Sequence, residues 1–120
     1  MVTGTLHVFR YSVYVLFDSG ASHSFIAADF VRQATLKTEP LGYDLNVSTP
    51  IGRSLIVNQV VYTEQLSISG FDTQAMLIVM PLIDYDVILG MDWLSANRAT
   101  IDCERKKVEF LGPDGDPACF

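Results

Sequence analysis

The carboxylate of Asp18 is the side chain in this sequence that is best placed to do chemistry. It follows the apolar residues 15–17 and precedes Ser19 and Gly20. Glycine permits a positive φ or a close backbone approach, and a serine hydroxyl can hydrogen-bond the main chain or a carboxylate. The pattern therefore predicts a carboxylate presented in a tight turn on a rigid apolar stem. A strand that simply ends in a turn is the alternative interpretation.

A second stretch, residues 86–94, favours the chemical interpretation. It reads DVILGMDWL, in which the apolar run Val87–Leu89 is followed directly by Gly90. Together the two stretches resemble the active-site turn and the apolar-apolar-Gly element of retropepsin-like aspartic proteases. Residues 16–26 and 86–94 are similar to the protease segment of gypsy-type long-terminal-repeat retrotransposon polyproteins. The resemblance extends over residues 3–111.

Aspartic-protease chemistry needs two carboxylates that share one proton, because like charges about 3 Å apart do not both stay ionised. One carboxylate activates a water as general base, and the protonated one polarises the scissile carbonyl. This chain contains one Asp-Ser-Gly turn, since none of its other aspartates is followed by a hydroxyl residue and then a glycine. The active form is therefore predicted to be a two-fold homodimer in which Asp18 faces its mate. Its nucleophile is a catalytic water, and no cofactor is expected.

The resemblance also implies roles for the residues of the turn. Asp18 takes the place of the catalytic carboxylate, and Ser19 that of a hydroxyl residue that links the two active-site turns of the dimer. Gly20 matches a glycine whose amide supports the carboxylates, and Ala21 matches the small residue after it. Ser22 stands where retroviral enzymes commonly have an aspartate that contacts the substrate backbone. A capping role for Ser22 is the alternative.

The resemblance extends to a flap and to the support of the turn. Residues 47–57 resemble the flap that closes over substrate, and an ordinary hairpin tip is the alternative there. Gly90 matches the glycine that packs behind the active-site turn. Asp92 and Trp93 are expected to begin a helix and to fill the core rather than to join the site. The expected tip of the flap consists of Thr49, Pro50, Ile51 and Gly52.

The substrate implied by this family is an extended polypeptide that lies between the flaps and the floor of the site. Main-chain hydrogen bonds supply affinity in such β-augmentation, and alternating pockets supply preference. The pocket walls are expected to be apolar. The residues predicted to form them are Val47, Ile51, Val87 and Ile88.

Composition limits the remaining possibilities. The 120 residues are 49% hydrophobic and 18% charged, which suits one globular domain, and no apolar run approaches the ~20 residues of a membrane helix. A net charge of −6 disfavours nucleic-acid binding. Cys103 and Cys119 are expected to be free thiols, and with His7 and His23 they show no metal-ligand spacing. No secretory signal is visible, so the expected location is the cytoplasm, and the resemblance to retrotransposon polyproteins implies virus-like particles there.

Alternating apolar residues and frequent turn signals predict a mainly β fold. The expected architecture is a small closed retropepsin-like barrel with one or two short helices and one lobe per chain. Helices are predicted over residues 24–34, with Ser22 or Ser24 as N-cap, and over residues 91–97. Residues 1–111 form the predicted domain, and 112–120 a flexible tail. The expected strands cover residues 3–9, 11–17, 43–48, 54–62, 64–69, 73–80, 87–89, 99–103 and 107–111.

The sequence thus predicts an aspartic endopeptidase that acts as a homodimer on a retrotransposon Gag-Pol-type polyprotein. A catalytically weak or inactive dimerisation and protein-binding module of the same fold is the main alternative. A ligand-binding β-barrel with a chance Asp-Ser-Gly triplet is a second alternative, and it would be monomeric.

Overall fold

The computed structural model describes residues 2–8, 11–48, 52–68, 70–111, 115 and 117–120, with the backbone alone at 64 and 65. In chain order its elements are β1 (Val2–Val8), β2 (Tyr11–Phe17), β3 (Ser24–Ala27), α1 (Ala28–Gln33), β4 (Glu39–Ser48), β5 (Ser54–Ile68), β6 (Phe71–Met80), β7 (Val87–Leu89), α2 (Met91–Ala96), β8 (Thr100–Asp102), β9 (Lys107–Leu111) and β10 (Pro117–Cys119).

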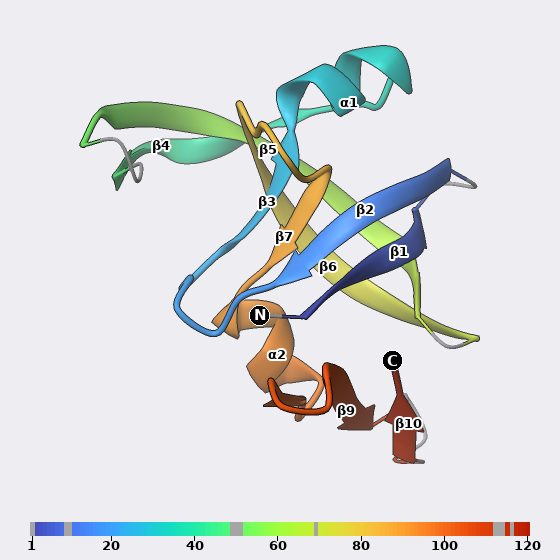
Figure 1. The fold of residues 1–120 in the computed structure, drawn as a ribbon. Helices are drawn as coiled ribbons and strands as arrows, with labels where there is room; N and C mark the ends of the chain where they lie inside the picture. Colours follow the sequence, from blue (N-terminus) through green and yellow to red (C-terminus); the bar gives the residue numbers. More distant parts are fainter. Residues whose placement is uncertain (1, 9–10, 49–51, 69, 112–114, 116) are drawn as a thin grey trace.

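Six strands close into a barrel in the order β1-β2-β7-β3-β6-β5, with β1 pairing back onto β5. The alternation in the sequence explains why these strands form, since Val13, Val15 and Phe17 of β2 point inward and are buried. Among the described strands β4 pairs with β5 alone, and the β4–β5 hairpin projects from the barrel (Figure 1). The predicted mainly β barrel with two short helices is confirmed.

Two of the strand pairings in the barrel wall are parallel. β2 pairs in parallel with β7, and β3 in parallel with β6, while β3 and β7 are antiparallel. The parallel β2–β7 register sets Phe17 opposite Leu89. Asp18 and Gly90 follow these two strands, and they therefore lie at the same end of the barrel.

Apolar side chains gather in two clusters. The larger one fills the barrel and includes Phe17, Leu89 and Trp93. The second contains Phe25, Val57, Val60, Ile78 and Met80, and half-buried residues of the β4–β5 hairpin pack against it. The second cluster joins that hairpin to the barrel.

The helix predicted over residues 24–34 is wrong in its first part. Ser24–Ala27 form β3, and α1 begins only at Ala28. The N-cap is Ala27, without a side-chain cap, rather than Ser22 or Ser24. The apolar spacing of Phe25 and Ile26 suits either structure. The barrel decides between them, because β3 is buried along its whole length and hydrogen-bonds to β6 on one edge and to β7 on the other.

The larger differences in boundaries from the prediction concern β5 and β4. β5 runs unbroken from Ser54 to Ile68, where two strands were expected, and it bends at a register shift between Thr63 and Leu66. A bulge of this kind lets one strand serve two neighbours, here β4 at its start and β1 at its end. β4 begins at Glu39 rather than at Tyr43, because Glu39 and Pro40 already pair with β5 ahead of a register shift between Pro40 and Leu45.

A second, three-stranded sheet of order β10-β9-β8 lies beyond α2 (Figure 1). The sequence predicts a flexible tail over residues 112–120, whereas residues 117–119 pair with β9 as β10. The ring of Phe120 packs on Phe17, with 5.1 Å between centroids, and against Gly4, where a Cβ would lie 2.3 Å from that ring. The Gly, Pro and Asp composition predicts a turn, but it carries no sign of this aromatic anchor.

Candidate active site

Asp18 lies directly after β2, where the parallel pairing with β7 continues by one hydrogen bond. The backbone N–H of Asp18 donates to the carbonyl of Leu89 at 2.9 Å. Residues 15–17 before it are buried, whereas the side chain of Asp18 is half-buried. A well-packed strand thus carries the carboxylate to the surface, as the sequence predicts for a rigid apolar stem.

The turn after Asp18 closes onto the carboxylate. The N–H of Gly20 donates to Oδ1 of Asp18 at 2.9 Å, and the N–H of Ala21 donates to the carbonyl of Asp18 at 3.2 Å. Ser19 and Ser22 are exposed, and the Ser22 hydroxyl lies 2.8 Å from Nδ1 of His23. One carboxylate oxygen is therefore held by the backbone of its own turn. Among the described residues no donor bonds to the other oxygen, which leaves that oxygen available to act on a reacting group.

Gly90 packs directly behind the 18–23 loop. A Cβ at Gly90 would lie 2.3 Å from the carbonyl oxygen of His23 and 2.6 Å from that of Ala21. Its φ of −99° suits any residue, so the lack of space is what requires glycine here. The next residue, Met91, donates its N–H to the carbonyl of Ala21 at 2.7 Å. The first turn of α2 therefore rests on the middle of the loop.

A side-chain link between Ser24 and Asp92 joins the end of the loop to α2. Ser24 is 1% exposed, and its hydroxyl donates to Oδ1 of Asp92 at 2.6 Å and accepts the N–H of Gly90 at 3.0 Å. The N–H of Ser24 donates to Oδ2 of Asp92 at 3.2 Å, and that of Trp93 to Oδ1 at 2.8 Å.

Sequence reasoning missed this link. The prediction that Asp92 begins a helix is correct, because Asp92 is the second residue of α2. An aspartate in a first helical turn is a common local signal, whereas nothing local indicates a partner 68 positions away.

The residues predicted to bind substrate lie in different places. Val47 and Ile88 are half-buried and pack against the second apolar cluster, as does Ala21 of the loop. Val87 is 0% exposed and faces the interior of the barrel, so its side chain does not form a pocket wall as predicted. Gly52 is exposed with a φ of +82°. The other predicted flap-tip residues, Thr49, Pro50 and Ile51, lie outside the described residues.

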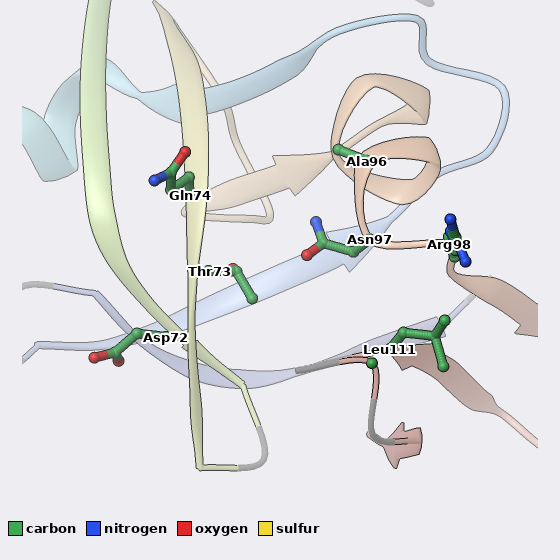
Figure 2. Close-up of a pocket in the computed structure, with 8 residues that line it drawn as sticks. Asp72, Thr73, Gln74, Ala96, Asn97, Arg98 and Leu111 are labelled. Carbon is green, nitrogen blue, oxygen red and sulfur yellow. The ribbon is translucent and has the colours of Figure 1, made fainter. Parts of the chain in front are cut away.

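A cavity of about 510 Å³ lies at the other end of α2 from the 18–23 loop. Figure 2 shows Asp72 and Arg98 on opposite sides of it, with Asn97 between them. The amide of Asn97 already donates to the carbonyl of Trp93. The cavity does not include Asp18, and we do not assign the chemistry to it. Its lining consists of Asp72, Thr73, Gln74, Ala96, Asn97, Arg98, Leu111 and Gly115.

Within the described ranges, no three His, Cys, Asp or Glu side chains gather in a way that would hold a metal ion. No helix in that part of the chain is both long enough and apolar enough to cross a membrane.

Comparison with known proteins bears on this site. No curated protein matches the chain. Among solved structures, the retroviral protease-like domain of Ddi1 from Leishmania major superposes with a TM-score of 0.67 at 16% identity, over 100% of this chain and 96% of that one. This likeness shows a shared fold. The family model described as retroviral aspartyl protease matches residues 1–115, which include the Asp18 turn, the β4–β5 hairpin and Gly90. The chain therefore belongs to the retroviral aspartyl protease family.

Proposed function

We propose that this protein is an aspartic endopeptidase in which Asp18 is the catalytic carboxylate. One observation carries the proposal: a half-buried aspartate at the end of a buried strand, held by the Gly20 amide, in a chain of this family. Such a turn holds the carboxylate in place, so its oxygen can react without a rearrangement of the loop. That is what general acid–base catalysis requires of its donor or acceptor.

The proposed reaction needs a second carboxylate, which the Asp18 of another copy of the chain supplies in a homodimer. The ionised carboxylate takes a proton from a water, whose oxygen attacks the scissile carbonyl carbon, while the protonated carboxylate donates to the carbonyl oxygen. Collapse of the tetrahedral intermediate transfers a proton to the leaving amine. No metal or organic cofactor takes part in these steps.

The proposed substrate is an extended peptide, bound between the 18–23 loop and the β4–β5 hairpin. Both lie to the left of the barrel in Figure 1, and Ala21, Val47 and Ile88 all pack against the second apolar cluster. Half-buried apolar side chains beside a carboxylate favour apolar substrate residues next to the cleaved bond. The resemblance of residues 16–26 and 86–94 to gypsy-type elements favours a retrotransposon polyprotein as natural substrate. The proposed location is then the cytoplasm or virus-like particles.

Cleavage of a mixed peptide library tests the proposal. The native chain and Asp18→Asn are compared from about pH 4 to 7, where a proton-sharing pair can work. We expect cleavage by the native chain and its loss in Asp18→Asn, because an amide cannot act as the general base. If neither protein cuts in a preparation shown to be dimeric, the proposal fails and a protein-binding module becomes the better interpretation.

A further inference from the structure

We propose that Ser24 and Asp92 are positioning residues of this site. Their hydrogen bonds hold the end of the 18–23 loop on the first turn of α2, and this contact keeps the carboxylate of Asp18 in its reactive position. The inference rests on the proposed function. Neither residue is expected to touch the substrate.

The bonding around Ser24 is complete, which is the first reason for the proposal. Its hydroxyl is both donor and acceptor, and both oxygens of the Asp92 carboxylate accept hydrogen bonds. A buried polar group generally persists only when such partners exist. Bonds to a charged acceptor are also stronger than neutral ones. The link therefore joins β3 to α2 through several hydrogen bonds to one charged group.

The loop is held on the β7–α2 segment at three points, and this is the second reason. The first is the N–H of Asp18 on the carbonyl of Leu89, and the second is the N–H of Met91 on the carbonyl of Ala21. These two are backbone bonds that many sequences could make. The third, between Ser24 and Asp92, depends on two particular side chains. Substitution there removes one anchor and leaves the other two intact.

Loss of that anchor is expected to act on the chemical step. The proposed substrate also contacts the β4–β5 hairpin and the second apolar cluster, which the link does not touch, whereas the reacting geometry depends on Asp18 in the loop that the link holds. A displacement of about 1 Å at a catalytic group can reduce the rate about 10²-fold. A change that acts only in the transition state lowers kcat and kcat/KM together and leaves KM nearly unchanged.

Two variants break the link from opposite sides. Asp92→Asn replaces one of the two accepting carboxylate oxygens by an amide N–H₂, which donates. The hydrogen bonds from Ser24 and Trp93 therefore cannot all form. Ser24→Ala removes the hydroxyl and leaves the charge on α2 unchanged. Asp29→Asn is the matched control, because Asp29 is likewise the second residue of a short helix. Its bonding is confined to an exposed pair with Arg32, away from the loop.

The experiment measures kcat per active site, titrated with a peptide that carries a non-hydrolysable hydroxyethylene group. We expect kcat to fall between about tenfold and 10²-fold in Asp92→Asn and in Ser24→Ala, with KM nearly unchanged, and to stay unchanged in Asp29→Asn. The double variant should lose no more than either single one, because both remove the same link. A purely structural role would lower the number of titrated sites and leave kcat per site intact.

Hydrogen exchange at the amides of Asp18, Ala21 and Met91 gives a second readout that does not depend on catalysis. These amides should exchange faster in Asp92→Asn and Ser24→Ala, and at the native rate in Asp29→Asn. Unchanged kcat per site and unchanged exchange in both link variants would overturn the inference. If the native chain shows no Asp18-dependent cleavage, the proposed function and the catalytic role of the link fail together, and exchange still reports whether the link holds the loop.

Discussion

Gly90 shows how a single residue can set the distance between a loop and a helix. Gly90→Ala is expected to destabilise the protein by about 1–3 kcal/mol, because the new methyl group would meet the backbone carbonyls of Ala21 and His23, which cannot rotate away. Gly4→Ala is the comparison, since its Cβ would meet the Phe120 ring, a side chain that can shift by giving up part of its packing on Phe17, and we expect a smaller loss there. Urea denaturation at one protein concentration compares the two free energies of unfolding. An equal loss in both variants would contradict this account of Gly90.

At the same scale, the sequence reveals the parts of the site that lie together in the chain. Asp18 and Gly20 are two residues apart, and their hydrogen bond follows from the turn chemistry of the triplet. Nothing in the sequence around Ser24 or Asp92 indicates that the two residues pair. Their pairing depends on β3 lying next to β7, which neither residue indicates. Val87 was placed in the pocket because its type suits a pocket wall, but the pleat of β7 turns it into the barrel.

Among the secondary structure elements, β5, β6 and α2 meet at one buried hydroxyl. Thr73 on β6 donates to the carbonyl of Leu66 in β5 at 3.0 Å and accepts the indole N–H of Trp93 in α2 at 3.1 Å. Trp93 is 2% exposed, with Phe17 and Phe110 beside its ring. The hydroxyl thus ties the helix that supports the 18–23 loop to the wall of the barrel.

Thr73→Val tests that junction with little change in volume. It leaves the buried indole N–H without an acceptor, so we expect a loss of about 1–3 kcal/mol in the free energy of unfolding. Thr5→Val, on the exposed face of β1, should stay within about 0.5 kcal/mol of the native value. Chemical denaturation followed by tryptophan fluorescence measures both. A loss in Thr73→Val no larger than in Thr5→Val would show that the junction contributes little.

Element types were more predictable than element boundaries. The hairpin of β1 and β2 follows from alternation, because one face of each strand is buried and the other is exposed except at Leu16. β3 was mistaken for helix because all four of its residues are buried, so no alternation marks it as a strand. β5 was divided in two because its bulge interrupts the period of two near Thr63. In both cases a neighbouring strand decides the structure, and a single segment does not show which neighbours it has.

For the whole molecule, frequent short strands predicted a closed barrel, but not its two parallel pairings. Those pairings join β2 to β7 and β3 to β6, elements far apart in the chain. The β2–β7 pairing also brings Asp18 next to Gly90 at one end of the barrel. The resulting site contains one carboxylate of the required kind per chain. Its proposed chemistry is therefore incomplete until a second copy supplies the other.

Dependence of the rate on protein concentration tests this incompleteness. Below the dissociation constant of the homodimer, the initial rate should rise with the square of the concentration, because each active site takes Asp18 from two chains. Asp18→Asn added in excess should lower the activity of the native chain, since mixed dimers hold one aspartate and cannot share a proton between two. Gly4→Ala, which keeps Asp18, should not act in this way when added in the same excess. A rate proportional to concentration, with no inhibition by Asp18→Asn, would show that one chain is sufficient, and the requirement for a second carboxylate would then be wrong.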